Sequence, residues 1–168
     1  MSLRYIKLVT TRLGIRYKWN EKFFYTKPRT KKEFTIRECN VSEWQKFRKY
    51  HYLNTEIHKS AKCYGLYDKE TIIGFIGILH FPCVNKKIKS VSRLVILPDY
   101  QGIGLGTKFL NIISDFYINN GYDFKIQTSA KNLINSLKNN EKWCLVRYGK
   151  VIPYKSRTII SRITKIVQ

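Results

Sequence analysis

Acidic residues are scarce in this sequence. It has 11 Asp and Glu against 32 Lys and Arg, so the formal net charge is +21 at pH 7. The excess is uneven, because residues 1–32 hold ten Lys or Arg and one acid, and residues 142–168 hold seven and none. Basic ends of this kind attract polyanions in a salt-dependent way. They favour a nucleic-acid substrate or partner, with a solubilising basic surface as the alternative.

Long apolar runs, paired cysteines and metal-ligand motifs are also missing. No run approaches the ~20 apolar residues of a membrane span, and the first eleven residues lack the apolar core of a signal peptide. The cysteines at positions 39, 63, 83 and 144 include no Cys-x-x-Cys pair, and the three histidines are not at metal-ligand spacing from them. We therefore expect no metal, free thiols and a cytoplasmic protein without membrane contact.

The chain does contain enough apolar sequence for a packed domain. Its 168 residues are 43% hydrophobic and 14% aromatic, which supports a core and excludes a disordered protein. Charge and pattern predict a basic N-terminal extension over 1–32 and a core over 33–149. A basic C-terminal strand over 150–168 is expected to complete the sheet.

Hydrophobic periodicity predicts strands and helices in the core. Strands are expected at Phe34–Cys39, Ala61–Tyr67, Thr71–Phe81, Ile88–Leu97 and Phe124–Thr128, with a final pair at Lys142–Tyr148 and Thr158–Val167. Helices are expected from a Ser42 cap to Tyr52, over Thr107–Asn119, and from Ser129 or Lys131 to Asn139. Two pieces of the N-terminal extension are strand-like, Tyr5–Thr10 and Phe23–Thr26.

The segment from Arg93 to Gly106 carries the clearest functional signal. An apolar strand runs through Leu-Pro-Asp into Gln-Gly-Ile-Gly-Leu-Gly at 101–106, and a helix follows at once. Glycines let backbone N–H groups converge, and the helix start adds the positive end of a dipole. This combination binds phosphate or pyrophosphate. The spacing does not fit a P-loop, and too little chain remains for a dinucleotide-binding half.

The pattern Gln-x-x-Gly-x-Gly, formed by Gln101, Gly104 and Gly106 directly after a strand, resembles the GNAT family of acyl-CoA-dependent N-acyltransferases. The order of the expected elements from Phe34 to Gly149 is also similar to that family. The resemblance implies an α/β class (α+β mixed sheet) and the GNAT acyl-CoA N-acyltransferase fold with splayed central strands. It further implies an N-acetyltransferase whose cofactor, acetyl-CoA (coenzyme A), inserts between those strands.

The resemblance also implies which residues contact the cofactor. The glycine loop and the helix start would hold the pyrophosphate, through Gln101, Gly102, Ile103, Gly104, Leu105, Gly106 and Thr107. Backbone groups of the preceding strand would pair with the pantetheine amides, at Val95, Ile96 and Leu97. Asn132, after the next strand, lies where the family contacts coenzyme A.

The candidates for acid and base catalysis depart from the family pattern. The strand Ile88–Leu97 contains no carboxylate, and Leu-Lys-Asn at 137–139 stands where the family often has Phe-Tyr. Acyl transfer requires a neutral amine and a protonated leaving group, and the sequence offers Ser129, Tyr148, His80 and His51 for these roles. A packing role is the alternative for each of them. Arg93 is expected either to pair internally or to bind substrate. The missing carboxylate does not exclude acyl transfer, because an amine that is already neutral needs no strong base.

A second, looser resemblance is to the viral Mom-type DNA-modification proteins. It rests on His-Tyr-Leu at 51–53, the strand Tyr64–Tyr67 and Arg-Leu-Val at 93–95, and it would explain the charge. The expected partners are therefore acyl-CoA and, through the basic ends, a nucleic acid such as tRNA, DNA or the ribosome. A GNAT-fold nucleic-acid-binding module without transferase activity remains the alternative from another class.

Overall fold

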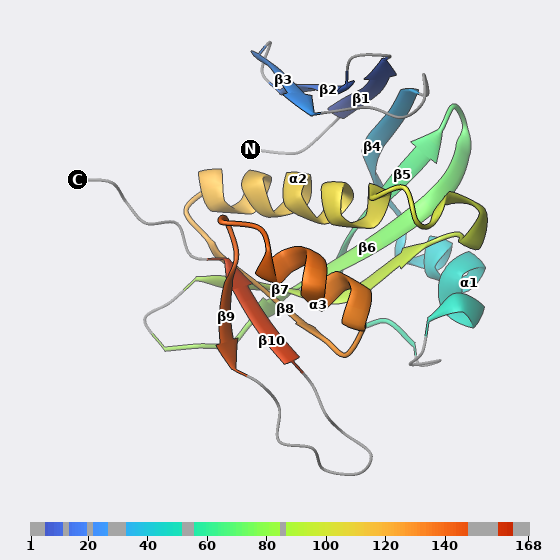
Figure 1. The fold of residues 1–168 in the computed structure, drawn as a ribbon. Coiled ribbons are helices and arrows are strands. Elements are labelled where there is room, and N and C mark those ends of the chain that lie inside the picture. The colour runs from blue at the N-terminus through green and yellow to red at the C-terminus, as the bar shows by residue number, and fades with distance from the viewer. Residues whose placement is uncertain are drawn as a thin grey trace.

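The fold is built on a mixed sheet of ten strands, with helices packed against it (Figure 1). The computed structural model describes residues 6–11, 14–19, 22–26, 33–51, 56–84, 87–147 and 158–162, with side chains described over 33–51, 56–84 and 87–146. The strand order is β3-β2-β1-β4-β5-β6-β7-β8-β10-β9. Neighbouring strands are antiparallel except β7 and β8, which are parallel.

The N-terminal part of the sheet is an antiparallel set of three strands. These are β1 (Ile6–Thr11), β2 (Gly14–Trp19) and β3 (Lys22–Thr26). β1 pairs with β4 (Glu33–Cys39), from Ile6 opposite Ile36 to Val9 opposite Glu33. The sequence pattern predicted β1, β3 and β4 but missed β2, because Arg16 and Lys18 interrupt its apolar residues. The basic N-terminal segment therefore continues the sheet beyond β4.

The middle of the sheet follows the predicted hairpin and central strands. β5 (Lys62–Asp68) turns through Lys69 and Glu70 into β6 (Thr71–Phe81), which leads to β7 (Ile88–Ile96). The turn is tight, and Lys69 has a positive φ of 56°. β8 (Asp123–Thr128) lies beside β7, and β10 (Thr158–Arg162) pairs with both β8 and β9 (Cys144–Arg147). These pairings confirm the predicted strands to within two residues; Tyr148 and residues 163–167, at the predicted ends of the final pair, lie outside the described residues.

The longest helix is α2 (Leu105–Asn119), and α3 (Lys131–Lys138) lies beside it on the same side of the sheet (Figure 1). α2 buries an apolar stripe at helical spacing, formed by Phe109, Leu110, Ile113, Phe116 and Tyr117. The stripe packs on the sheet, as predicted. Gly121, with a φ of +79°, follows the C-cap Asn120 and ends the helix, because a left-handed residue there costs glycine nothing.

The predicted helix from Ser42 to Tyr52 is wrong as a single element. The chain forms three short turns instead: η1 (Val41–Glu43), α1 (Trp44–Phe47) and η2 (Arg48–Tyr50). Neither η1 nor α1 has a side-chain cap. Trp44 and Phe47, three residues apart, are fully buried against Phe75. Two anchors at this spacing suit a mixture of 3₁₀ and α turns, so packing overrides the helical periodicity.

Two apolar clusters lie on opposite sides of the sheet. The larger, under α2 and α3, includes Phe34, Tyr64, Ile76, Phe109 and Phe124. The smaller, under α1, includes Trp44, Phe47, Ile57, Phe75 and Val95. Alternate residues of one strand therefore enter different clusters, as a sheet buried on both faces requires. Within the described residues, none of the helices is long and apolar enough to cross a membrane.

Candidate functional site

The two central parallel strands separate partway along their length. β7 and β8 pair only from Ile88 opposite Asp123 to Val91 opposite Ile126, although both strands continue further. At the same level β7 carries a bulge against β6: Gly77 is opposite Arg93 and Ile78 is opposite Val91, so Ser92 is the additional residue. A bulge bends its strand and increases the local twist. The predicted splay of the central strands is thus confirmed, and it begins at Ser92.

The main-chain groups of β7 beyond the bulge point alternately toward β6 and toward the opening. The N–H of Leu97 donates to the carbonyl of Ile73 on β6 (2.8 Å). Because successive residues of a strand present their polar groups to opposite edges, Val95 also faces β6, and Leu94 and Ile96 face the opening. Of the three residues predicted to pair with a pantetheine chain, Ile96 lies on the open edge.

The glycine loop follows directly at this end of the sheet. η3 (Pro98–Tyr100) leads into Gln101, and α2 begins at Leu105 with Gly104 as N-cap. Gly102 and Gly104 have φ values of +78° and +79°, and a Cβ at either position would meet no atom within 4 Å. The loop is therefore lined by backbone with open space in front of it. The first N–H groups of a helix have no intrahelical acceptor, so this arrangement fits the pyrophosphate of coenzyme A.

Side chains at the two ends of the loop hold its shape. The Nε2 of Gln101 donates to the carbonyl of Ile96 (2.7 Å), and the hydroxyl of Tyr100 donates to the carboxylate of Asp68 (3.0 Å). The hydroxyls of Thr107 and Ser136 are 3.1 Å apart and join the first turn of α2 to α3. The side chains of Gln101 and Thr107 thus make contacts within the protein. A phosphate at this loop would therefore be held mainly by the backbone amides.

One cation lies in the first turn of α2. Lys108 is half-buried, and burial lowers the pKa of its ammonium group. Its backbone N–H donates to the carbonyl of Gly104 (3.2 Å), which is the first bond of the helix. A cation in this turn adds to the positive end of the helix dipole, so both favour an anion at the loop.

The candidates after β8 lie at the same end of the sheet. Ser129 and Asn132 are exposed, one between β8 and α3 and the other in the first turn of α3. The buried hydroxyl of Thr128 accepts a hydrogen bond from the N–H of Ala130 (3.1 Å) and so stabilises the turn into α3. Ser129 therefore stays a candidate for contact with a bound molecule. Tyr148 lies outside the described residues.

The two histidine candidates are on different parts of the sheet. His80 is exposed and lies opposite Lys89 near the C-terminal end of β6. It faces the side of the sheet opposite to the α1 cluster. His51 packs edge-on against Trp44, with ring centroids 5.5 Å apart, and the guanidinium of Arg93 lies 5.6 Å from the Trp44 ring. His51 and Arg93 thus share contacts with Trp44 on the α1 side of the sheet, and His80 lies two positions along β6 from Ile78 at the bulge.

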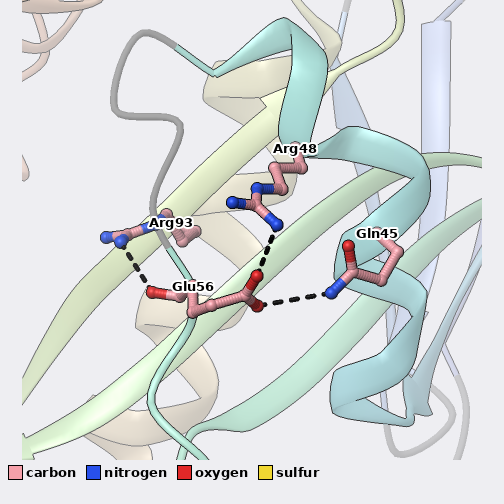
Figure 2. Close-up of polar contacts among 4 residues, drawn as sticks. All are labelled: Gln45, Arg48, Glu56 and Arg93. Carbon is pink, nitrogen blue, oxygen red and sulfur yellow. Dashed lines mark hydrogen bonds and ion pairs between the residues drawn. The ribbon is translucent and has the colours of Figure 1, made fainter.

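The sequence did not point to a polar network on the α1 side of the bulge (Figure 2). Arg93 donates to the carbonyls of Ser92 (2.8 Å) and Glu56 (3.1 Å), which confirms that it pairs internally. The carboxylate of Glu56 accepts hydrogen bonds from Arg48 and from Gln45. Glu56 and Arg93 are 37 residues apart, and nothing in either segment marks the other. The presence of a cation in an apolar strand was the available signal.

Metal ligation finds no support in the part of the chain that the structure describes. There, no three His, Cys, Asp or Glu residues are grouped so that they could hold a metal ion. Cys39 and Cys63 are opposite each other on β4 and β5, and burial raises the pKa of their thiols to about 12 and about 11. Both thiols are therefore protonated at neutral pH.

Comparisons with known proteins agree with this geometry. The sequence profile described as the acetyltransferase (GNAT) family matches residues 19–135, more than half of the chain. No curated protein matches the chain significantly. Among solved structures, an IAA acetyltransferase from Bacillus cereus ATCC 14579 aligns with a TM-score of 0.62 at 10% identity, over 77% of this chain and 98% of that one.

Two further solved structures contain the cofactor or an analogue. Naa50 of Arabidopsis thaliana, in complex with the bisubstrate analogue CoA-Ac-MVNAL, aligns with a TM-score of 0.58 at 14% identity, over 78% of this chain and 99% of that one. The yncA protein of Salmonella typhimurium, with its cofactor acetyl-CoA, aligns with a TM-score of 0.59 at 11% identity, over 77% and 92%. These likenesses show the fold, and the profile shows the family. The chain belongs to the acetyltransferase (GNAT) family, whose N-acetyltransferases use acetyl-CoA.

Proposed function

We propose that this protein transfers the acetyl group of acetyl-CoA to an amine that a nucleic acid or nucleoprotein carries or presents. One observation supports the transfer: three features coincide at one end of the sheet. These are the open edge of β7 beyond Val91, the glycines with positive φ, and the start of α2. A backbone lining in front of open space is suited to a diphosphate, and the open strand edge is suited to an extended amide chain.

The residues of this chain divide the work of such a transfer. Bound acetyl-CoA would supply an activated thioester carbonyl in the opening. The amides of Gly104 to Thr107 would bind its diphosphate, and the main-chain groups of Leu94 and Ile96 would orient its pantetheine chain. His51, His80 and Ser129 are the candidates for moving a proton within the described residues; His51 packs against Trp44, and Ser129 is exposed directly after β8.

The charge distribution supports the nucleic-acid part of the proposal. The two ends of the chain together hold 17 of the 32 Lys and Arg residues and one acid. A field of this sign raises the rate of encounter with polyanions, and each phosphate contact adds to the salt dependence of binding. An acceptor amine on RNA, DNA or a ribosomal assembly would be concentrated near the site by this field.

The experiment combines calorimetry with label transfer. Acetyl-CoA should bind the purified protein, and absence of binding at millimolar ligand would reject the transferase. Labelled acetyl-CoA is then incubated with the protein and a total extract, and the product is treated with nuclease or with protease. Label released by nuclease supports an acceptor on nucleic acid. Label released by protease alone would reject an acceptor on nucleic acid. If the labelled protein is ribosomal, the amine is one that a nucleoprotein presents.

A salt titration tests the polyanion independently of the chemistry. Filter binding with tRNA and with duplex DNA should weaken steeply as salt rises from low to physiological concentration. Affinity that does not change with salt would contradict contacts dominated by phosphate. Binding of either nucleic acid without any acetyl transfer would instead favour the binding-module alternative.

A peptide amine is the second candidate acceptor. It is supported by the bisubstrate analogue in the Naa50 structure, whose name joins coenzyme A to the peptide MVNAL. An α-amino group has an unperturbed pKa of about 7.7–8.0, so a useful fraction is neutral at physiological pH and needs no strong base.

Duplex DNA in the same assay tests the resemblance to Mom-type proteins, through label or mass added to adenine.

A further inference from the structure

We infer that Arg93 is a positioning residue of the transfer reaction. Its guanidinium holds the acceptor-side segment Glu56–Ser60 against the bulge of β7, at the point where the cofactor site opens. The inference rests on the proposed acetyl transfer, and it concerns a residue that bonds to Ser92 and Glu56 and lies over Trp44. It follows from contacts on the α1 side of the sheet (Figure 2).

The bulge of β7 leaves a carbonyl that Arg93 satisfies. Ser92 is the additional residue between the Gly77–Arg93 and Ile78–Val91 pairs, and β7 has just left β8. Nη1 of Arg93 donates to the carbonyl of Ser92 (2.8 Å). A half-buried main-chain carbonyl at an irregular position requires such a donor. The guanidinium is therefore fixed at the beginning of the splay.

The same guanidinium reaches the segment that crosses the sheet. Nη2 donates to the main-chain carbonyl of Glu56 (3.1 Å), and the group lies over the ring of Trp44. The next residue, Ile57, is buried in the α1 cluster. An ideal Cβ at Gly77, the cross-strand partner of Arg93, would lie 2.5 Å from Cδ1 of Ile57. The missing side chain at Gly77 thus lets Ile57 lie beside Arg93.

The side chain of Glu56 is fixed from the other direction. One carboxylate oxygen accepts from Arg48 and the other from Gln45, both on the short turns around α1 (Figure 2). This side chain is 61% exposed, so its ion pair contributes little stability. The segment is therefore located mainly by its backbone, through Arg93 on one side and the burial of Ile57 on the other.

The location of this segment explains why its hydrogen bond with Arg93 matters for acetyl transfer. α2, with the glycine loop at its start, covers the other side of the sheet, so a thioester placed between β7 and β8 reaches the α1 side beside Ser92. The residues that follow the Glu56 carbonyl, 57–60, are then a wall of the acceptor pocket. Displacement of such a wall by about 1 Å can reduce transfer by up to about 100-fold. Binding of the diphosphate would not change, because the loop is held by Gln101 and Tyr100.

Arg37 provides a matched control. It faces the same side of the sheet, its Nη2 donates to the carbonyl of Lys69 (3.3 Å) and contacts Glu70 (3.0 Å), and its guanidinium lies over Tyr67 (4.1 Å). Like Arg93, it joins a carbonyl and an aromatic ring. It does so at the β5–β6 turn, away from the splay. Arg37→Met therefore removes the same kinds of contact without affecting the proposed pocket wall.

The experiment compares Arg93→Met, Arg93→Lys, Glu56→Gln and Arg37→Met in the full chain. Acetyl-CoA affinity, measured by calorimetry, should stay within about twofold in all four, because none alters the loop. Transfer of labelled acetyl to the extract fraction that the wild-type enzyme labels should fall about 10- to 100-fold in Arg93→Met. It should fall less in Arg93→Lys, since an ammonium can reach one carbonyl but lacks the planar fork for two.

Hydrogen exchange supplies a readout that does not depend on activity. The amides of residues 57–61 should exchange faster in Arg93→Met and at the wild-type rate in Arg37→Met. Glu56→Gln should keep transfer within about fivefold of wild type, since it retains the main-chain carbonyl that Arg93 binds. Equal transfer in wild type and Arg93→Met, or an equal loss in Arg37→Met or Glu56→Gln, would overturn the inference. Absence of acetyl-CoA binding by the wild type would instead reject the proposed function. Hydrogen exchange would still test whether Arg93 holds the segment after Glu56.

Discussion

The two sides of β7 are constructed differently. On the α2 side the contacts come from consecutive residues, because strand, η3, glycine loop and helix start follow one another from Leu94 to Lys108. On the α1 side they join distant parts of the chain, and Arg93 and Glu56 are 37 residues apart. The α2 side presents mainly backbone and the α1 side mainly side chains. One side therefore suits an invariant ligand, and the other can change with the acceptor.

This difference determines how each side responds to substitution. A main-chain amide is lost only on substitution by proline, so other substitutions disrupt the α2 side by blocking its space or by straining a glycine. A side-chain contact can be removed alone, so the α1 side can lose one hydrogen bond at a time. The comparison is sharpened most by a substitution that fills the space in front of the loop.

Gly104→Glu should have the largest effect on ligand binding. The side chain would enter the open space before the loop, and its charge would repel a diphosphate, so acetyl-CoA affinity should fall at least about 100-fold. Gly121→Glu is the control, since Gly121 has the same φ of +79° and the same open surroundings at the other end of α2. The two variants should lose similar stability in thermal melts, while calorimetry should show binding only in the second. Equal binding by both would break the comparison.

The α2 side of the site, which is built from consecutive residues, was also the predictable one. The strand–loop–helix segment has a short-range signature, and β7, the loop and α2 were predicted to within two residues. At β2 the period-2 signal was present, since Ile15, Tyr17 and Trp19 alternate with Arg16 and Lys18, but the two charges obscured it. Periodicity failed at α1, where burial of Trp44 and Phe47 decides the turns. Tertiary packing overrides local preference in such short elements.

The α1 side of the site, which joins residues far apart in the sequence, had no local sequence signature. Glu56 lies in the polar stretch 54–60, whose composition does not decide between a loop and a short helix. Its link to Arg93 exists only once β6 and β7 have paired. The sequence left two roles open for Arg93, internal pairing or substrate binding, because a cation in an apolar strand requires a partner of some kind. It could not identify that partner, since contacts across a sheet depend on register.

A buried pair of hydroxyls joins β5 to the C-terminal half of α2. The hydroxyls of Tyr64 and Tyr117 are 2.8 Å apart, and both residues are nearly fully buried. Tyr64→Phe should cost about 1–3 kcal/mol of unfolding free energy, because the hydroxyl of Tyr117 loses its partner. The double change with Tyr117→Phe should cost less than the sum of the single changes, as for residues in contact. Chemical denaturation measures both, with Tyr122→Phe as a control on the same side.

The same pair should make stability fall at alkaline pH. Burial raises the pKa of Tyr117 to about 12 and raises that of Tyr64 further, while an unfolded tyrosine ionises near about 10. Between these values the unfolded chain loses protons that the folded chain retains. Stability then falls by about 1.4 kcal/mol per pH unit for each such phenol. The stability of wild type relative to the double Phe variant should decrease from pH 9 to 11, and a constant difference would contradict the assignment.

Gln101→Ala tests a side-chain contact on the backbone side. The amide of Gln101 donates to the carbonyl of Ile96 and holds the entry of the loop. Its loss should weaken acetyl-CoA binding by about 0.5–1.5 kcal/mol, which is about 2- to 12-fold, because one hydrogen bond that shapes the loop is lost. Calorimetry at constant salt measures the change, and Gln45→Ala on the α1 side is the control. A loss as large as that of Gly104→Glu would mean that Gln101 contacts the phosphates directly.

The smallest effect is expected at an ion pair that belongs to neither side of the site. Lys62 on β5 contacts Glu38 on β4 (3.1 Å), with side chains 56% and 34% exposed. Exposed pairs contribute about 0–1 kcal/mol, so Lys62→Met should change the unfolding free energy by no more than that. Cofactor affinity and acetyl transfer should both match the wild type in calorimetry and label transfer. If this variant reduced transfer as Arg93→Met is expected to, loss of a basic charge would explain both results, and the contrast between backbone and side-chain construction would lose its support on the α1 side.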